Sequence, residues 1–513
     1  MLVAGVALVA GCATWRLEVP HAPSHAIDAG QDSFLARNVA SRIDRSSGLS
    51  GFRVLASGQE AFLARAALAE SAQHSLDLQY FIVAEDATAT LLLYRTLRAA
   101  QRGVRVRLLV DDLYVAGRDA DLAVFAAHPN VEVRVFNPFR FRSLQGLARI
   151  LEILGDGARL NQRMHNKLWI ADNAAGVVGG RNLGDAYFAA QGASDFADLD
   201  LLATGPIVAE LSRSFDEYWN SELAVPIEAI AGEPPVAGQL EEVLAQMASK
   251  ADRFRDTEYA QSLRATDLGR LLRRGEVPLV AARATALRES PAKPPGDAAD
   301  RHPESPISLR PIVEKARREA ILVSPYFIPS ERGMGVLCAL VRQGIRVRIL
   351  TNSLASTDVP VVHAGYAHYR PRLLACGVEL HELRPGAKRA EGARRGLSSG
   401  GSLHAKALVV DREVVVVGSM NFDPRSRFSN TEIGVLIESA ELGGELGTLF
   451  DEATSLDQSF RVELTNPGDE NSPLTWAALE NGLPVRYTEE PLAGWWRRVS
   501  SAVLGALAPE EML

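Results

Sequence analysis

The alternation of apolar and polar stretches over residues 75–110 predicts a strand, a helix and a second strand in succession. Residues 75–83 form a strand-like apolar run, and apolar residues then recur at helical spacing over residues 88–102. Gly103 leads into a second strand-like run at residues 104–110. Strand, helix and strand at this spacing are typical of a βαβ unit with parallel strands.

The same succession recurs about 240 residues further along the chain, which is the pattern of an internal repeat. Strand-like runs at residues 320–328 and 345–350 flank a helical segment at residues 334–343. The sequence RGVRVRLLV at residues 102–110 is similar to QGIRVRILT at residues 343–351. We therefore expect an α/β fold built from two similar halves.

Two histidine-containing segments, one in each half, have the same internal spacing. From each histidine a lysine follows at +2, an aspartate at +7, a glycine at +14 and an asparagine at +17. The two sets are His165, Lys167, Asp172, Gly179 and Asn182, and His404, Lys406, Asp411, Gly418 and Asn421. Side chains two positions apart on a strand point to the same side, so each histidine shares a face with its lysine. Two halves that face each other would place both sets around one pocket.

This set of side chains suits the transfer of a phosphodiester. One imidazole can attack phosphorus to form a covalent intermediate, while the other protonates the leaving oxygen and then deprotonates the incoming alcohol. The lysines and the amides of Asn182 and Asn421 can neutralise the non-bridging oxygens, so we predict that both asparagines bind phosphate. The chemistry requires no metal or other cofactor, and we expect none.

Carboxylates that follow each motif are candidates for orienting the histidines, because a reactive imidazole works better when its second nitrogen is held. The segment DLD at residues 198–200 follows the first motif, and NTE at residues 430–432 follows the second. Aligning the two segments pairs Asp200 with Glu432. We predict that these two carboxylates orient the histidines.

Two other features have structural interpretations. Asp172 and Asp411 are counted with the catalytic motif, but each ends a strand, so we interpret them as residues that pin the following turn. The pair Tyr80-Phe81, like its copy in the second half, is interpreted as strand core.

These motifs resemble the signature of the phospholipase D superfamily, His-x-Lys-x4-Asp-x6-Gly-(Gly/Ser)-x-Asn, which occurs there in two copies. The resemblance extends over nearly all of residues 60–505. It implies duplicated phospholipase D-like α/β/α sandwich domains related by a pseudo-two-fold axis, with one active site on the seam. It also implies a phosphohistidine intermediate. Gly180 stands where serine is the commoner of the two residues.

Within the superfamily the chain looks most like bacterial cardiolipin synthases of the C type, over residues 78–82, 110–113 and 418–426 and in the tail. That resemblance implies a phosphatidyltransferase that forms cardiolipin from phosphatidylglycerol and a second phospholipid, possible donors including phosphatidylethanolamine. By the same resemblance His165 is assigned as the nucleophile and His404 as acid and base. The alternatives are a hydrolase that releases phosphatidic acid, a nuclease of the same superfamily and a catalytically silent membrane scaffold.

The N-terminus resembles an export signal. Residues 1–11, MLVAGVALVAG, are apolar or small and end directly before Cys12. They are too short to span a bilayer, which takes about 20 residues, but suit the apolar region of a signal. The run VAGC at residues 9–12 resembles the lipobox of bacterial lipoproteins, which implies lipidation of Cys12 and a periplasmic location, more readily on the outer membrane than the inner. The alternative is an apolar chain end without a role.

The tail and the other two cysteines add further expectations. The segment WWRR at residues 495–498 opens an amphipathic helical pattern, which suits either a membrane surface or a terminal helix packed on the protein. Cys338 and Cys376 lack zinc-site spacing and are expected to be free, buried thiols rather than a disulfide. The formal net charge of −8 does not favour nucleic acid as a partner.

We therefore expect six segments along the chain. They are a lipoprotein-type signal (1–11), an N-terminal extension (12–50), a first phospholipase D-like domain (51–233), bridging helices and a loop (234–306), a second such domain (307–460) and a tail with an amphipathic helix (461–513).

Overall fold

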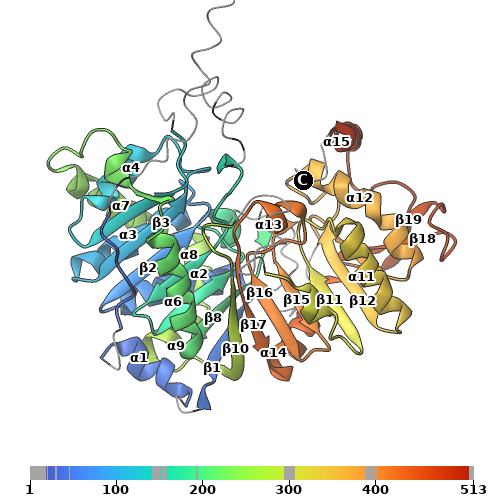
Figure 1. Ribbon diagram of the computed structural model, residues 1–513, viewed down its shortest axis with the longest axis horizontal. Helices are drawn as coiled ribbons and strands as arrows, with labels where there is room; N and C mark the ends of the chain where they lie inside the picture. The colour runs from blue at the N-terminus through green and yellow to red at the C-terminus, as the bar shows by residue number, and fades with distance from the viewer. Residues whose placement is uncertain are drawn as a thin grey trace, which may run out of the picture.

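The computed structural model describes residues 19, 21–28, 32–44, 47–140, 152, 157, 159–191, 195–293, 307–387, 397 and 401–507. Two α/β halves lie side by side (Figure 1). The predicted signal at residues 1–11 and the predicted lipidation site Cys12 lie outside the described residues, as does most of the predicted loop up to residue 306.

The first half contains a sheet in the order β9-β4-β3-β2-β5-β6-β8-β1, in which β2, β3 and β4 are parallel. Its strands are β1 (Ser50–Leu55), β2 (Ser75–Tyr80), β3 (Arg105–Asp111), β4 (Val131–Phe136), β5 (Leu168–Ala171), β6 (Ala175–Gly179), β8 (Asp200–Thr204) and β9 (Ala224–Pro226). Helices cover both faces, with α6 on the side opposite to α2, α3 and α4. The helices are α1 (Phe34–Asn38), α2 (Gly58–Ser71), α3 (Ala87–Gln101), α4 (Asp119–Ala126) and α6 (Pro206–Trp219).

The second half repeats this plan in the order β17-β16-β15-β11-β12-β13-β18-β19-β20, with β11, β12 and β13 parallel. Its strands are β11 (Glu319–Val323), β12 (Arg346–Asn352), β13 (Glu379–Leu383), β15 (Ala407–Val410), β16 (Val414–Gly418), β17 (Ile433–Glu438), β18 (Ser459–Leu464), β19 (Leu474–Glu480) and β20 (Leu483–Tyr487). Its helices are α10 (Arg310–Val313), α11 (Ser330–Arg342), α12 (Pro360–Ala375), α13 (Pro424–Phe428), α14 (Ala440–Ala453) and α15 (Trp495–Leu507).

The predicted βαβ units and the duplicated α/β fold are confirmed. The segments β2-α3-β3 and β11-α11-β12 have the expected order, and both strand pairs are parallel. The glycine that follows each helix, Gly103 or Gly344, has a φ of +93° or +84°, in the left-handed region. Glycine reaches that conformation without steric cost, which explains why the repeat keeps it at both turns.

The strand β10 (Val280–Arg288) joins the halves into one continuous sheet. It pairs antiparallel with β1 on one side and with β17 on the other, at the centre of Figure 1. One hydrophobic core cluster contains side chains of both halves, including those of α6 and α14, such as Phe215 and Phe450. Because the two sheets share this core, the seam between them is held by apolar burial as well as by strand pairing.

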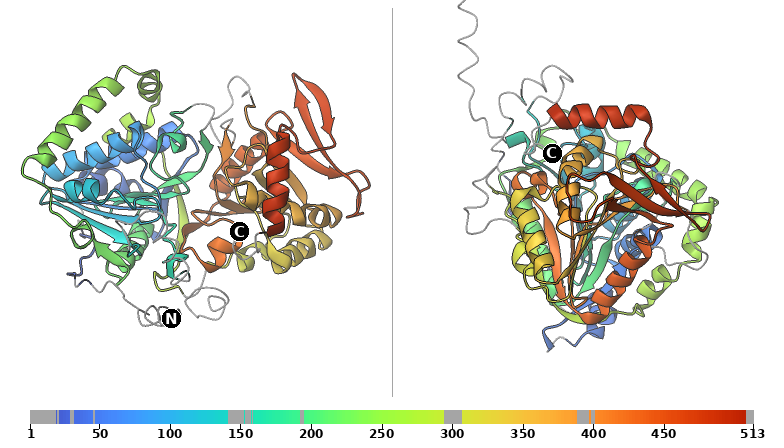
Figure 2. Two further views of the ribbon diagram at one scale, coloured as in Figure 1. Left: turned by 90° about the horizontal axis from the view of Figure 1, so that it is seen from above. Right: turned by 90° about the vertical axis from the view of Figure 1, so that its right-hand side faces the viewer.

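The helices predicted to bridge the halves belong to the first half instead. These are α7 (Gln239–Phe254), α8 (Glu258–Arg264) and α9 (Leu268–Arg274), which pack on α2 and α3. In the left view of Figure 2, α7 lies on the outer side of the first half, away from the second. Their apolar stripe therefore covers the first sheet's helix layer, and β10 makes the connection.

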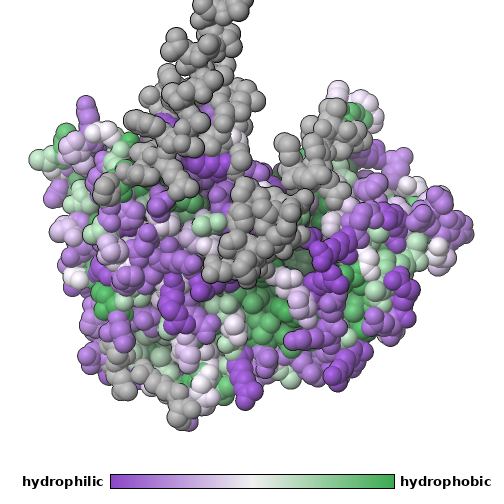
Figure 3. Space-filling model, in the orientation of Figure 1, coloured by the Kyte–Doolittle hydropathy of each residue, from purple (hydrophilic) through white to green (hydrophobic). Residues whose placement is uncertain are grey.

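The tail helix α15 packs on α12 with one side and exposes aromatic residues on another. It lies on the outside of the second half in both views of Figure 2. Trp495 is 60% exposed and Trp496 is 76% exposed. Figure 3 shows a different apolar region, a hollow lined by hydrophobic side chains in the middle of the face, over the strands labelled β11 and β15 in Figure 1.

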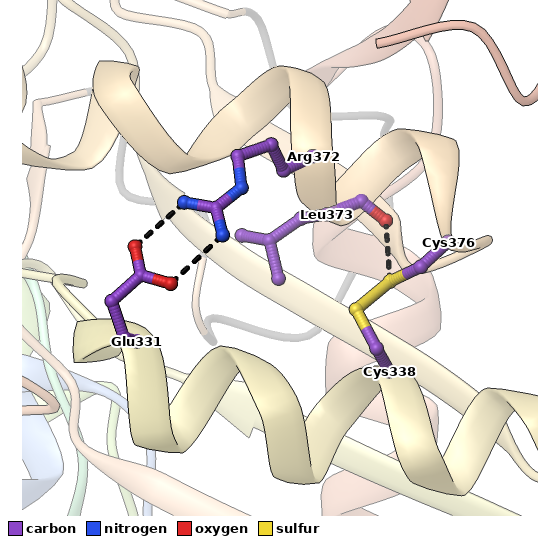
Figure 4. The surroundings of a disulfide bond; sticks show 5 residues. All are labelled: Glu331, Cys338, Arg372, Leu373 and Cys376. Atoms are coloured by element: carbon purple, nitrogen blue, oxygen red, sulfur yellow. Dashed lines mark hydrogen bonds and ion pairs between the residues drawn. A yellow bond between two sulfur atoms is a disulfide. The ribbon is translucent and has the colours of Figure 1, made fainter.

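The expectation that Cys338 and Cys376 are free thiols is wrong, because they form a disulfide. The bond joins α11 to α12, whose Cα atoms at these residues are 5.6 Å apart, and an ion pair between Glu331 and Arg372 connects the same helices (Figure 4). The sequence did not reveal the pairing because the cysteines are 38 residues apart, and only the packing of α11 against the end of α12 brings them within bonding distance.

We expect Cys338→Ser to lower the free energy of unfolding by about 2–4 kcal/mol, because the bond closes a long loop in the unfolded chain. Thermal unfolding of the variant and of the wild type in dithiothreitol should show similar decreases in Tm. As a direct check, iodoacetamide should label neither cysteine in the unfolded, unreduced wild type. Modification of both without a reductant would contradict the disulfide.

Candidate active site

The two histidine segments meet at the seam, each beside a segment of the other half. Met164 forms a parallel β-bridge with Thr431, and the backbone N–H of His165 donates to the Thr431 carbonyl at 2.9 Å. In the equivalent place, β14 (Ser402–Leu403) pairs with β7 (Phe196–Ala197), and the N–H of His404 donates to the Ala197 carbonyl at 2.7 Å. His165 therefore lies against the segment that leads into β17 of the second half, and His404 lies against the segment that leads into β8 of the first half.

Each histidine is oriented by a carboxylate from the opposite half. Nδ1 of His165 lies 2.9 Å from Oε2 of Glu432, and Nδ1 of His404 lies 2.5 Å from Oδ2 of Asp198. A carboxylate at Nδ1 fixes the ring and leaves Nε2 available for reaction. The histidine side chains are each 8% exposed, and both carboxylates are fully buried. The two halves thus complete one another's histidine.

The prediction that Asp200 orients a histidine is wrong, and Asp198 has that position. The Asp200 carboxylate instead accepts a hydrogen bond from Arg65 at 2.9 Å and lies 3.4 Å from Arg181. All three side chains are buried, so Asp200 is the counter-charge that the two arginines share inside the first half. Its role is structural.

The sheet register explains this error. Gly179 of the first motif pairs with Asp200, whereas its counterpart Gly418 pairs with Gly434. Asp200 therefore corresponds to a glycine in the second half, and the orienting carboxylate stands two positions earlier in both halves. A count from the motif glycine finds this carboxylate once the register of the strand pair is known.

Glycine rather than the commoner serine stands at position 180 because Asp198 occupies the space that a side chain would need. A Cβ at Gly180 would lie 2.2 Å from Oδ1 of Asp198. The second half has Ser419 at this position, and its hydroxyl donates to Glu432 at 2.5 Å. Ser426 donates to the same carboxylate at 2.8 Å, so Glu432 is shared between a histidine and two hydroxyls.

The motif aspartates contact backbone rather than the histidines. The Asp172 carboxylate accepts from the N–H groups of residues 73–75 at 2.7–3.1 Å. Asp411 accepts from those of residues 317–319 at 2.7–2.9 Å. Both residues adopt a φ of +54°, so each carboxylate fixes a tight turn to the start of a parallel strand. These contacts fit the structural interpretation.

The two motif lysines are buried beside their own histidines. Nζ of Lys167 donates to the His165 carbonyl at 2.5 Å, and Nζ of Lys406 donates to the His404 carbonyl. Burial lowers the pKa of Lys167 to about 7 and that of Lys406 to about 8. An anionic phosphodiester would stabilise the charged form of both lysines, which makes them suitable counter-charges for it.

We expect kcat/KM to fall as the pH rises from 7 to 9. The lysines are charged below their lowered pKa values of about 7 and 8, and each loses its proton as the pH passes that value, which removes charge that attracts the phosphate. A pH profile of kcat/KM checks this. Lys406→Arg keeps its charge at all these pH values and should move part of the decline to higher pH, whereas a flat wild-type profile up to pH 9 would contradict the assignment.

The two motif asparagines, both predicted to bind phosphate, differ in their hydrogen bonds. Oδ1 of Asn182 accepts from the Ile82 N–H at 3.1 Å, and its Nδ2 donates to the Tyr187 hydroxyl at 3.0 Å. Oδ1 of Asn421 is buried and has no hydrogen-bond partner among the described residues. Phosphate binding by either residue stays a prediction. Of the two amide oxygens, that of Asn421 is the one without a hydrogen-bond partner in the described part of the chain.

Aromatic side chains pack around both histidines. The ring of Phe81 lies 5.0 Å from that of His165, edge to face, and Tyr187 and Phe196 each lie 5.2 Å from His404. The interpretation of Phe81 as strand core is therefore wrong: it is half-buried and forms a wall of the site. These rings limit the access of water to the reactive nitrogens.

The histidines differ in electrostatic environment. Burial and the two lysines hold the pKa of His165 well below its usual value, and burial raises the pKa of its partner Glu432 to about 7. Burial and Lys406 also lower the pKa of His404, but Asp198 opposes them. Burial acts to raise the pKa of Asp198, yet His404 and nearby cations outweigh it and keep that pKa below its usual range. Asp198 is thus the more strongly ionised partner.

One group elsewhere in the described residues has the composition of a metal site. Oxygen and nitrogen atoms of His363, Glu382 and Glu490 lie within 4.8 Å of one another. Arg370 donates to both carboxylates, at 2.9 Å and 2.5 Å, and Trp476 donates to Glu382 at 3.0 Å. The arginine already supplies a positive charge there, so we assign the group a structural role.

Paired histidines, each held by a buried carboxylate and accompanied by a buried lysine, define a two-histidine phosphodiester-transferring enzyme. The sequence model of the family described as "Cardiolipin synthase, PLD-like domain" matches residues 66–219 and 309–454. Cardiolipin synthase C of Escherichia coli (strain K12) is 38% identical over 93% of this chain and 99% of its own length. The chain belongs to this phospholipase D-like family.

Two further comparisons extend the likeness. An uncharacterised protein of Helicobacter pylori (strain J99) is 31% identical over 91% of this chain and 89% of its own. The crystal structure of phosphatidylserine synthase from Haemophilus influenzae superposes with a TM-score of 0.55 at 14% identity, covering 92% of this chain and all of that one. At that identity the superposition shows the fold alone.

Proposed function

We propose that the protein is a phosphatidyltransferase that forms cardiolipin from phosphatidylglycerol and a second phospholipid. The observation that carries the proposal is the pair of histidines held in one site by carboxylates of opposite halves. Membership of the cardiolipin synthase family supports the substrate class.

In the first step, Nε2 of His165 attacks the phosphorus of the donor phospholipid. The bond from phosphorus to the head-group oxygen breaks, and His404 gives its proton to that oxygen. In the second step, neutral His404 takes the proton of a head-group hydroxyl of phosphatidylglycerol, and that oxygen displaces His165 from phosphorus. Lys167 and Lys406 balance the charge on the non-bridging oxygens. The products are cardiolipin and the free head-group alcohol.

The environments of the two histidines support this division of labour. A nucleophile must be neutral, and burial and nearby lysines keep the pKa of His165 well below its usual value. An acid must first hold a proton; burial and Lys406 lower the pKa of His404, but the ionised Asp198 opposes them, so His404 holds its proton more readily than His165 does. His165 as nucleophile and His404 as acid and base are therefore the roles we propose.

We further propose that the protein is attached to a membrane by a lipid on Cys12, faces the periplasm and resides more readily at the outer membrane than at the inner. The disulfide between Cys338 and Cys376 supports an oxidising compartment, because such bonds are rare where thiols are kept reduced. In the described part of the chain, every helix is too short or too polar to cross a bilayer.

Exposed aromatic residues near the active site support contact with a lipid surface. On one side, Tyr114 is 54% exposed and packs 5.1 Å from Phe81, which contacts His165. On the other side, α15 exposes its two tryptophans, and Arg497 of that helix donates to the carbonyls of Leu354 and Thr357, just beyond β12. Tyrosine and tryptophan favour the head-group level of a bilayer.

The experiment that tests the proposed reaction supplies the purified protein with labelled phosphatidylglycerol, with and without phosphatidylethanolamine, and identifies the lipid products. We expect cardiolipin, and the same rate in EDTA. Phosphatidic acid without any cardiolipin would replace the transferase with a hydrolase. Loss of activity in EDTA that one added metal restores would contradict the metal-independent mechanism.

A further inference from the structure

A cavity of 410 Å³ lies in the second half between α11, α13 and residues 307–313. Two elements that border it, α11 and α13, flank the apolar region in the middle of the face in Figure 3. Most of its walls are apolar side chains, and these include Ile307, Leu309, Val313, Phe327, Val336 and Phe428. Val313, Leu322 and Phe327 also belong to the hydrophobic core cluster of the second half, so the cavity opens at the edge of that core.

The cavity reaches the catalytic motif. Asn421, with its buried and unpartnered Oδ1, is part of its lining, together with Met420 and Phe422 on either side. A second, smaller cavity shares Met420 and Phe422 with it and is lined by Lys406. An apolar space therefore adjoins two side chains, Lys406 and Asn421, that belong to the phosphate-binding set.

The two halves differ at this place. Phe81 of the first half packs on His165, as described above. In the second half, Phe327 turns to Phe422, with ring centroids 6.2 Å apart, and forms part of the cavity wall, whereas the equivalent β-bridge of the first half has the smaller Val83 in its place. The duplication therefore has an aromatic wall against the histidine in one half and an apolar cavity beside the motif in the other.

We propose that this cavity binds one acyl chain of the phospholipid substrate, an inference that rests on the proposed function. A phospholipid has its phosphodiester a few bonds from its acyl esters, so a site for the phosphate at Lys406 and Asn421 requires an apolar site close by. Pockets of this volume and lining take apolar ligands. Arg310, which pairs with Glu314, and Arg332 also line the cavity, together with one carboxylate, Asp423; this excess of positive charge favours an anionic lipid such as phosphatidylglycerol.

Helix α11 offers a test variant and a matched control. Gly333 lines the cavity, and a Cβ there would meet its nearest neighbour, Cβ of Pro329, at 3.4 Å, an ordinary contact distance. Gly335, on the same helix, is exposed and has no atom within 4 Å of such a Cβ. Gly333→Leu therefore reduces the cavity, and Gly335→Leu makes the same change on the solvent side. Val336→Trp fills more of the cavity.

The measurement is the rate of phosphatidyl transfer from dioleoyl and from dihexanoyl phosphatidylglycerol in the same detergent micelles, relative to wild type. We expect Gly333→Leu and Val336→Trp to reduce the rate with the long-chain lipid by about tenfold or more, and that with the short-chain lipid by less than about twofold. Gly335→Leu should change neither rate. Tm values within a few degrees of wild type show that the variants fold.

Equal losses with both lipids, or no loss in either cavity variant, would overturn the proposal. Loss of long-chain activity in Gly335→Leu would do the same. Failure of the proposed function gives a different result: wild type then makes no cardiolipin from either lipid. The chain-length ratio can in that case be measured on the phosphatidic acid released, so the cavity is tested independently of the acceptor.

Discussion

Replacing His165 or His404 with alanine is expected to reduce the rate of cardiolipin formation by at least about 10⁴-fold. His165→Ala removes the atom that attacks phosphorus, and His404→Ala removes the proton carrier for both steps. Because the groups act as a unit, the double variant should be no slower than either single variant. Initial rates with labelled phosphatidylglycerol measure the effect, and full activity in either single variant would eliminate the two-histidine mechanism.

A donor with a good leaving group separates the two roles. Phosphatidyl-p-nitrophenol needs no acid to expel its nitrophenolate, so His404→Ala should still release one equivalent of nitrophenol in a burst. His165→Ala should give no burst. A burst in His165→Ala and none in His404→Ala would reverse the assignment of nucleophile and acid.

The second large effect is expected at Asp198. Asp198→Asn keeps the shape of the side chain but removes the charge at 2.5 Å from Nδ1 of His404, and kcat should fall by about 10²–10⁴-fold. Tm should change little, because the asparagine can still hydrogen-bond to the ring.

Asp200→Asn is the matched control two residues away. Asp200 pairs with buried Arg65 and Arg181, so breaking that group should lower the free energy of unfolding by about 3–5 kcal/mol. The rate of the folded fraction should stay within a few-fold of wild type. A large loss of kcat in Asp200→Asn, with full activity in Asp198→Asn, would restore the alignment that the sequence suggested.

Local pattern and repetition predicted most of the fold. Apolar periodicity located both βαβ units, and the equal spacing of two motifs placed His165 and His404 in one site. Both features depend on residues close in sequence or on a comparison of the chain with itself. The α/β class and the duplicated halves were accessible for the same reason.

Features that depend on the contact between distant elements were not accessible. The choice between Asp198 and Asp200 is a matter of strand register, which two residues of the same type in one short run do not reveal. The pairing of Cys338 with Cys376 requires α11 and α12 to pack side by side with the two cysteines at the same level along the helices. An amphipathic stripe over residues 239–274 shows that those helices have a partner, but not which half provides it.

The exchange of carboxylates across the seam has a consequence for the origin of the chain. Each half supplies the carboxylate that holds the histidine of the other half. This is the arrangement of a homodimer whose protomers have been joined by a linker, with the β1–β10 pair near the pseudo-two-fold axis. Neither half alone would contain a complete histidine–carboxylate pair, so a severed half should be inert even if it folds. Once the protomers are fused, their sequences can differ. One half now has Asp198 beside Gly180, and the other has Glu432 beside Ser419. A symmetric dimer cannot divide nucleophile from acid by sequence, whereas a joined one can.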